Sequence, residues 1–321
     1  MVRTIVDVVH VGSASRDVAA DDPRGWRLGG GVSYGALTTA RIGLRTAAIV
    51  GLDRVAAPAH ELDLLRAAGV AIQPALLGRG PVFDNVQTRT GRVQTVMAAG
   101  QPLAPPDDLP SDWRDPRAWS LVPVAGEVDD RWLAVIGPGA LVALGWQGWL
   151  RRLVVGGQVG RRAPRASGLT RRADLVGVST EDLAPGVEPA GLAPYLRAGA
   201  RLLVTDGPAG GWLVVSDATG PTQTVPYQAI VSATEIDPTG AGDVFLAAYL
   251  ACIVRPDVVG ISGADVVDPL RFAAAAASLA VEGPGLAGVP DLDAIRARLA
   301  ARPTGPSGVE GGSSSEGPPP G

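Results

Sequence analysis

Short apolar runs alternate with longer stretches of helical character along most of the chain. The apolar runs are rich in β-branched residues and leucine, and they have the length of buried strands. They cover residues 4–11, 46–50, 133–136, 141–144, 175–178 and 202–205. The predicted helices are mostly alanine-rich and cover residues 34–42, 59–68, 190–198, 241–254, 269–281 and 292–301. Because such alternation is typical of a parallel sheet covered by helices, we predict an α/β fold with a central, mainly parallel sheet.

The pattern changes between residues 80 and 101, where polar and apolar residues alternate on both sides of Thr90-Gly91. Thr-Gly is typical of a hairpin turn, so this segment predicts a small β-structure on the main sheet. We expect a β-lid built from about residues 13–28 and 83–100. Residues 156–172, rich in Gly and Arg, are expected to form a surface loop.

From residue 302 the chain is rich in Gly, Pro and Ser and has too little apolar surface to offset the entropy of ordering. We therefore expect one domain over residues 1–301 and a disordered tail over residues 302–321. A length of 321 residues with 46% hydrophobic residues is sufficient for one large domain.

Composition narrows the range of functions. The net charge of −4 and the lack of a basic block argue against a nucleic-acid or membrane partner. Every positive side chain is an arginine, so no mechanism can use a lysine. The single cysteine, Cys252, excludes a disulfide within the chain and a thiolate metal cluster. Together with a first segment that lacks the features of a secretion signal, this predicts a cytoplasmic protein.

The run Asp237-Pro-Thr-Gly-Ala-Gly-Asp243 carries the chemistry. It is followed by an apolar stretch, so small residues open a helix whose first turn holds a carboxylate. Gly240, Ala241 and Gly242 leave the N–H groups at the helix N-terminus accessible to an anionic oxygen. Asp243 can accept a proton from an alcohol that attacks a phosphate. A shorter Gly-x-Gly-Asp would more often be a simple helix cap, but the full run favours phosphoryl transfer.

Asp-x-Thr-Gly-Ala-Gly-Asp resembles the C-terminal signature of the ribokinase-like family, also called the pfkB carbohydrate kinases. The resemblance covers the chain to about residue 301. It implies a three-layer fold in which helices flank the central sheet, with ATP and Mg²⁺ as cofactors. Asp243 then corresponds to the catalytic base, and Gly240, Ala241 and Gly242 correspond to the anion hole.

The resemblance also implies an acceptor site. Asp17 matches the acid with which the family binds substrate hydroxyls. Gly29 and Gly30 match the glycine pair that borders the sugar. Tyr34 stands where the family usually has Asn, either as a substrate contact or as a packing residue. Ser33-Tyr34 and a Gln-Gly-x-x-Arg form ending at Arg151 resemble the inositol-kinase-like branch, which makes cyclitols reasonable substrates.

On the donor side, Ser179 and Asp182 stand where the family has Asn-x-x-Glu, so Asp182 is expected to bind magnesium indirectly. The resemblance also implies residues that contact the nucleotide and two residues that bind a monovalent cation. Nucleotide contacts are expected from Ser179, Thr205, Gly207, Gly210 and Ala274, and a monovalent cation, K⁺, is expected at Asp237 and Thr239.

These features predict an ATP-dependent kinase that phosphorylates a hydroxyl of a small sugar, cyclitol or nucleoside and that forms a homodimer through its lid. Departures from the family at Tyr34, Gly145, Ser179 and Ala274 keep a second hypothesis open, a catalytically weakened member that senses a nucleotide or sugar. A nicotinamide-dependent dehydrogenase fits the alternation of elements but requires Gly-x-Gly-x-x-Gly after the first strand, which is missing here.

Overall fold

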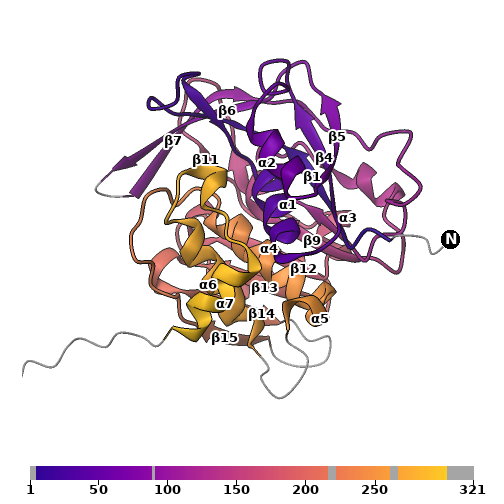
Figure 1. Cartoon of the computed structure of the whole chain (residues 1–321), viewed down its shortest axis with the longest axis vertical. Helices are drawn as coiled ribbons and strands as arrows, with labels where there is room; N and C mark the ends of the chain where they lie inside the picture. The colour runs from indigo at the N-terminus through magenta and orange to yellow at the C-terminus, as the bar shows by residue number, and fades with distance from the viewer. Residues whose placement is uncertain (1–4, 89–90, 216–221, 261–266, 302–321) are drawn as a thin grey trace, which may run out of the picture.

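The computed structural model describes residues 5–88, 91–215, 222–260 and 267–301 (Figure 1). Within them, nine strands form one sheet in the order β15-β14-β13-β12-β9-β8-β1-β4-β5. All neighbours from β13 to β5 are parallel, whereas β14 and β15 extend the sheet with antiparallel pairs. The mainly parallel sheet predicted from the sequence is confirmed. Its strands are β1 (Val8–Ser13), β4 (Thr46–Leu52), β5 (Ala71–Leu76), β8 (Ala118–Leu121), β9 (Leu141–Gly145), β12 (Leu175–Ser179), β13 (Arg201–Thr205), β14 (Gly211–Val215) and β15 (Gln223–Tyr227).

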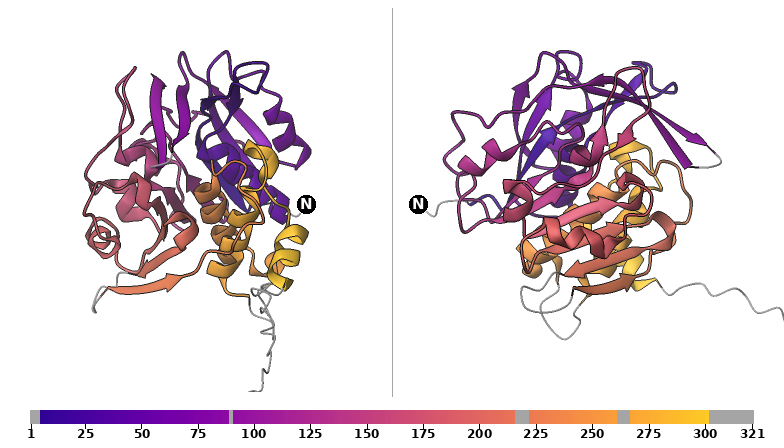
Figure 2. Two further views of the ribbon diagram at one scale, coloured as in Figure 1. Left: turned by 90° about the vertical axis from the view of Figure 1, so that its left-hand side faces the viewer. Right: turned by 180° about the vertical axis from the view of Figure 1, so that it is seen from behind.

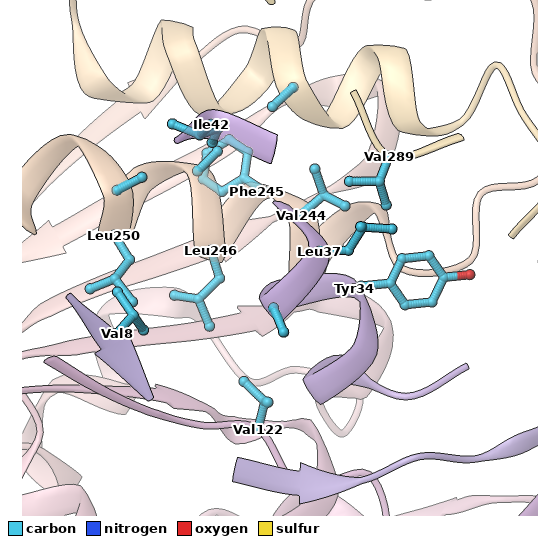
Figure 3. Packing of buried hydrophobic residues seen from close by; sticks show 14 of the residues in the cluster. Val8, Tyr34, Leu37, Ile42, Val122, Val244, Phe245, Leu246, Leu250 and Val289 are labelled. Carbon is cyan, nitrogen blue, oxygen red and sulfur yellow. The ribbon is translucent and has the colours of Figure 1, made fainter. Parts of the chain in front are cut away.

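Helices cover one face of this sheet (Figure 1). They are α1 (Gly31–Ile42), α2 (Glu61–Ala67), α4 (Ala241–Val254), α6 (Pro269–Ala280) and α7 (Leu292–Ala300), and the short α5 (Pro256–Val259) follows α4. The central helix, α4, is buried along nearly its whole length, as its almost uniformly apolar sequence requires. Its side chains pack with those of α1 and β1 into one hydrophobic cluster (Figure 3).

A second cluster fills the opposite face, because successive side chains of a strand point to opposite sides. In β1, Val8 faces the α1 and α4 side, whereas Val9 and Val11 belong to the second cluster. This face is covered by short 3₁₀ helices and one α-helical turn (Figure 2). They are η1 (Asp130–Ala134), η2 (Trp146–Leu150), η3 (Thr180–Asp182), η4 (Pro189–Tyr195) and α3 (Gly168–Arg172). The three-layer prediction is therefore confirmed, although the second helical layer is thin.

Several local predictions were wrong. Residues 133–136 are not a strand, because the side chain of Asp129 caps a 3₁₀ turn that runs through Leu133. Residues 190–198 do not form an α-helix, since Pro194 cannot donate an N–H and the segment is the 3₁₀ helix η4. The strands β5, β8, β14 and β15 were missed.

A four-stranded sheet in the order β3-β2-β6-β7 stands at one end of the molecule and includes the two segments expected to form the lid (Figure 1). Its strands are β2 (Arg16–Val18), β3 (Trp26–Leu28), β6 (Pro81–Thr88) and β7 (Gly91–Ala99). The predicted Thr90-Gly91 turn and the tail from residue 302 fall on, or next to, residues outside the described ranges.

The segment expected to be a plain surface loop, residues 156–172, has structure of its own. β10 (Arg151–Arg152) pairs with β11 (Gly160–Arg161), and the connection between them lies along the edge of β7. There the N–H of Val96 donates to the carbonyl of Gly157 at 2.9 Å, and the N–H of Val159 donates to that of Gln94 at 2.8 Å. Ser167 then opens α3 with a capping box. Residues 156–172 are thus connected to the lid by backbone hydrogen bonds.

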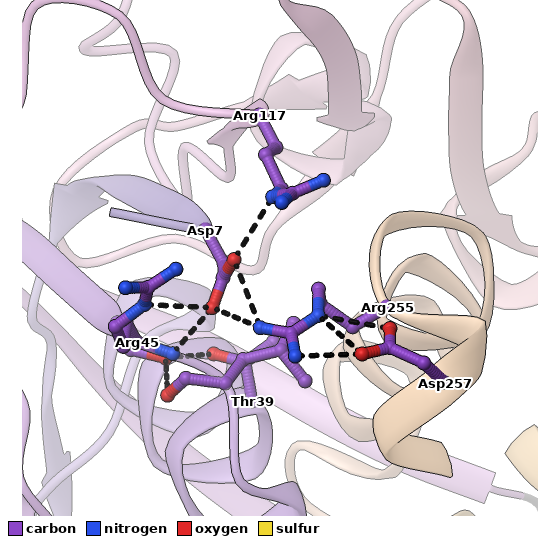
Figure 4. Close-up of polar contacts among 8 residues, drawn as sticks. Asp7, Thr39, Arg45, Arg117, Arg255 and Asp257 are labelled. Carbon is purple, nitrogen blue, oxygen red and sulfur yellow. Dashed lines mark hydrogen bonds and ion pairs between the residues drawn. The ribbon is translucent and has the colours of Figure 1, made fainter. Parts of the chain in front are cut away.

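At the far end of β1, Asp7 is fully buried and surrounded by three arginines (Figure 4). Its carboxylate accepts from Arg255 at 3.1 Å and also pairs with Arg45 and Arg117. These partners come from the turn after α1, the segment before β8 and the end of α4, so one carboxylate joins three parts of the fold. No helix in the described part of the chain has both the length and the apolar character needed to cross a membrane.

Candidate active site

Three consecutive glycines lead into α1 and lie against two carboxylates. A Cβ on Gly29 would stand 2.2 Å from Oδ2 of Asp17, and one on Gly31 would stand 2.7 Å from Oδ1 of Asp243. Gly30 between them has φ 91° and would place a Cβ 2.6 Å from the carbonyl oxygen of Ser13. A side chain at Gly30 would meet backbone at a positive φ, and one at Gly29 or Gly31 would displace a carboxylate, so the glycines create the room in which both acids lie.

The carboxylate of Asp17 is on the lid, and that of Asp243 is on the main domain. Asp17 belongs to β2, where its Oδ1 accepts from the hydroxyl of Ser15 at 3.1 Å. Asp243 belongs to the first turn of α4, which begins at Ala241 after Gly240 in the left-handed conformation. The N–H groups of a first helical turn have no carbonyl one turn earlier to bind, so they remain suited to an anion. The N–H of Ala241 itself donates to the carbonyl of Pro238 at 3.3 Å.

A cavity between the lid and the carboxyl ends of the parallel strands brings these acids together, as is typical of ligand sites in α/β proteins. Its lining is mostly polar. It consists of Ser15, Asp17, Gly30, Gly31, Tyr34, Phe83, Gln94, Val124, Gln147, Arg151, Thr239, Gly240 and Asp243.

A wider hollow elsewhere has no such convergence. It is lined by residues around Asp129, Asp130 and Trp149, and none of the predicted site residues contributes to it. Asp130 accepts the N–H groups of Gly168 and Leu169, and Asp129 pairs with Arg131, so its charges are satisfied locally. The cavity that holds Asp17 and Asp243 is therefore the candidate active site.

Arg151 is the main lining residue that the sequence did not assign to the site. It is buried, and its guanidinium lies 5.6 Å from the ring centroid of Phe83 on the lid. Its Nε stands 3.6 Å from Oδ1 of Asp182, and Nε2 of Gln147 donates to Oδ2 of the same carboxylate at 3.3 Å. The Gln-Gly-x-x-Arg spacing was the available signal, since it places both side chains on η2 and the following strand.

Buried Glu127 holds the loop beside Arg151. Its carboxylate accepts the N–H groups of Ser13 and Ala125 at 2.8 Å and that of Val124 at 3.2 Å. Burial raises the pKa of this carboxyl, and the three N–H groups act in the opposite direction. Arg151 donates to the carbonyl of Val124 at 3.3 Å, so Glu127 connects the end of β1 to the arginine.

The expected donor side lies at the ends of β12 and β13. Ser179 and Thr205 are register partners there, and a Cβ on Gly242 would stand 3.9 Å from the hydroxyl of Thr205. Gly207 and Gly210 follow in the turn after β13, with φ 52° and 95°. Four of the predicted nucleotide contacts thus lie at the ends of β12 and β13, and Thr205 among them is beside the start of α4. Ala274 lies on α6 and is buried within the main hydrophobic cluster.

The expected metal positions differ in how well they fit a cation. Ser179, Glu181 and Asp182 offer the oxygens that Mg²⁺ prefers, and Glu181 is exposed. Asp182 is engaged by Arg151, so its contact with a metal would run through water. Asp237 accepts the N–H groups of Thr239 and Gly285 at 2.9 and 3.0 Å, and it links two loops whether or not a cation binds. The described residues contain no cluster of three His, Cys, Asp or Glu side chains suited to a metal.

Comparison with solved structures identifies the class of fold. A pyrophosphate-dependent kinase in the ribokinase family, complexed with a pyrophosphate analog and myo-inositol, matches with a TM-score of 0.67 and 19% identity over 90% of this chain and 99% of that one. Arabidopsis thaliana ribokinase, complexed with ribose and ATP, matches with a TM-score of 0.64 and 20% identity over 93% and 100%. Methanocaldococcus jannaschii nucleoside kinase matches with a TM-score of 0.64 and 15% identity over 92% of this chain and 98% of that one. The chain has the ribokinase-like α/β fold.

One part of the sequence matches a family model. Residues 173–292 match the model of the pfkB family carbohydrate kinases, and this range contains the predicted donor side and the Asp237 to Asp243 run. Over this range the chain is similar to the pfkB carbohydrate kinases. No curated protein sequence matches it.

Proposed function

We propose that this protein transfers a phosphoryl group to a hydroxyl of a small polyol and that Asp243 is the base. The observation that carries the proposal is the pair of carboxylates, Asp17 and Asp243, which lie against Gly29 and Gly31 in one cavity at the start of α4. One acid on the lid and one on the main domain suit an acceptor held between the two.

Each part of the cavity has a role in this reaction. Asp17 and Ser15 bind acceptor hydroxyls, and Asp243 takes the proton of the hydroxyl that attacks the phosphorus. A new O–P bond forms while the bond from phosphorus to the leaving oxygen breaks. The first-turn N–H groups of α4 stabilise the charge on the transferred group. Bound magnesium would neutralise the phosphates of the donor, with Ser179, Glu181 and Asp182 as its oxygen side chains.

The acceptor is best matched by a compact, uncharged polyol. Two carboxylates, two amides and a guanidinium line a small cavity, which suits a ring with many hydroxyls. The structural relative complexed with myo-inositol supports a cyclitol, and those named for ribose and a nucleoside keep sugars and nucleosides in the test.

ATP is our first choice of donor, because Ser179, Thr205, Gly207 and Gly210 resemble the family's nucleotide-binding residues and lie at the ends of β12 and β13. Pyrophosphate is the second. The donor of the relative bound to myo-inositol supports it, and so does Arg161, whose Nε donates to the carbonyl of Glu181 at the donor-side turn. The side chain of Ala274, buried in the main hydrophobic cluster, also offers no polar contact to the nucleobase of ATP.

The test is a panel of sugars, cyclitols and nucleosides, each assayed with ATP and with pyrophosphate in the presence of magnesium. Release of ADP identifies one donor and release of phosphate from pyrophosphate identifies the other. The Asp243→Asn variant keeps the shape of the side chain but cannot accept the proton, so we expect kcat to fall by about 10²–10⁴-fold with little change in acceptor KM. Omitting K⁺ tests the predicted cation.

Two outcomes would change the assignment. If Asp243→Asn turned over at the wild-type rate, Asp243 would not be the base. If the wild type bound ATP but phosphorylated no acceptor, the chain would be the sensor that its departures from the family suggest.

The lid supports a homodimer as a further part of the proposal. Val18, Val86 and Met97 are about half exposed on its strands, at 40%, 51% and 52%, and such apolar residues favour pairing of surfaces. Light scattering after size-exclusion chromatography should give twice the mass of the chain. The cytoplasmic location stays a prediction.

A further inference from the structure

Tyr34 has an unusual position for a residue at the acceptor site. It projects from the first turn of α1, is 2% exposed, and belongs to the main hydrophobic cluster (Figure 3). Its ring lies directly on the backbone of Gly240: a Cβ there would stand 2.5 Å from Cδ1 and Cε1 and 2.6 Å from Cγ. The side chain therefore contacts the residue that precedes α4.

Gly240 determines where the anion hole lies. It has φ 82°, and this left-handed turn directs the chain into α4, so the N–H groups of the first turn follow from its placement. On the other side of the loop, Asp237 accepts the N–H groups of Thr239 and Gly285. The hydroxyl oxygen of Tyr34 is 3.9 Å from the position of a Cβ on that same Gly285. The ring thus extends from Gly240 toward the loop that Asp237 binds.

We propose that Tyr34 is a positioning residue, whose ring holds Gly240, and through it the N–H groups of the anion hole, in place while the residue also contributes to the lining of the acceptor cavity. The effect on catalysis rests on the proposed function. The contact with Gly240 is made by ring carbons, so the ring and not the hydroxyl performs this role. A filled acceptor cavity then presses on the same ring that supports the donor phosphate.

Three variants separate this role from others. Tyr34→Phe keeps the ring, Tyr34→Leu removes it while staying apolar, and Leu65→Ala in α2 disturbs the same hydrophobic cluster at a distance from the loop. We expect Tyr34→Leu to lower kcat by about 100-fold and to change the acceptor KM by less than about threefold. Tyr34→Phe should retain kcat. If Tyr34 only bound the acceptor through its hydroxyl, Tyr34→Phe would instead raise KM, and the proposal would be overturned.

Hydrogen exchange provides a second readout that needs no turnover. In the protein without ligands, the amides of residues 237–243 should exchange at least about tenfold faster in Tyr34→Leu than in the wild type. Their exchange rates should be unchanged in Tyr34→Phe. Leu65→Ala should leave the exchange rates of residues 237–243 as they are in the wild type. Equal exchange in wild type and Tyr34→Leu would refute the proposal. Because this measurement involves no acceptor or donor, its result stands even if the kinase activity is not found.

Discussion

At the scale of single residues, the active site depends on what is missing from the glycine run before α1. Gly31 has ordinary helical geometry, so any residue could adopt its backbone, yet its Cβ would stand 2.7 Å from Asp243 and 3.1 Å from Val122. A side chain there would meet Asp243 first and Val122 next. The glycine is required for the position of the carboxylate and not for the conformation of the chain.

Replacing Gly31 by alanine should therefore affect catalysis more than folding. We expect Gly31→Ala to lower kcat by about 100-fold, because the added methyl displaces the carboxylate by a fraction of an ångström to an ångström. Gly139→Ala is the matched control, since nothing lies within 4 Å of its Cβ position, and its kcat should be unchanged. Steady-state kinetics with the acceptor found in the panel decide the matter; a fully active Gly31→Ala would contradict the geometry proposed here.

The sequence predicted several residues that the structure brings into one cavity. Asp243 and the small residues between Gly240 and Gly242 were predicted from a run with its own physical reason, and Asp17 was predicted from the family resemblance. Their catalytic and binding roles stay predictions. Arg151 could not, because its role depends on Asp182 and the lid, which are far from it in the chain. The contact of Tyr34 with Gly240 was hidden for the same reason.

At the scale of elements, α1 is packed tightly onto β1 over a buried histidine. His10 lies in β1, where Nε2 is 3.0 Å from the hydroxyl of Thr39 on α1. A Cβ on Gly35 of α1 would stand 2.9 Å from Nδ1 of the same ring. Burial lowers the pKa of His10 from 6.5 to about 3, so the folded protein holds the ring neutral.

This packing makes stability depend on pH. Between about pH 3 and 6.5 the unfolded chain binds a proton at His10 that the folded chain does not, so the stability from this group is complete above about pH 6.5 and declines as the pH falls. At about pH 5 the loss is about 2 kcal/mol relative to about pH 7.5. Urea unfolding of the wild type and of His10→Gln at both pH values should show a smaller loss in the variant by that amount. Equal losses in both proteins would show that His10 does not titrate on unfolding.

Elements with a strong periodic pattern were predicted well, and those determined by their partners were not. The helices α1, α4, α6 and α7 begin and end within a few residues of the predicted bounds. Capping side chains of Asp268 and Asp291 start α6 and α7, and glycines with positive φ precede α1 and α4. β8 has only four residues, all buried, and becomes a strand through pairing with β1 and β9. Residues 156–172 acquired structure from the edge of β7, which no local pattern could indicate.

At the scale of the whole molecule, Asp7 connects segments that are distant in sequence (Figure 4). Its carboxylate is 0% exposed, while Arg45 and Arg117 are about half exposed and Arg255 is 20% exposed. The carboxylate of Asp7 is thus buried, whereas the arginines that pair with it are partly exposed to solvent. Through Arg255 it binds the end of α4, the helix whose first turn carries Asp243.

Because this node is at the opposite end of α4 from the base, its loss should reduce stability without altering the chemistry. We expect Asp7→Asn to lower the free energy of unfolding by about 3 kcal/mol, since three guanidinium groups lose their buried counter-charge. Asp257→Asn is the control, because this carboxylate is 63% exposed where it pairs with Arg255 and should change stability far less. Urea unfolding measures both, and kcat of folded Asp7→Asn should equal that of the wild type. A loss of kcat without a loss of stability would mean that Asp7 influences the active site through α4.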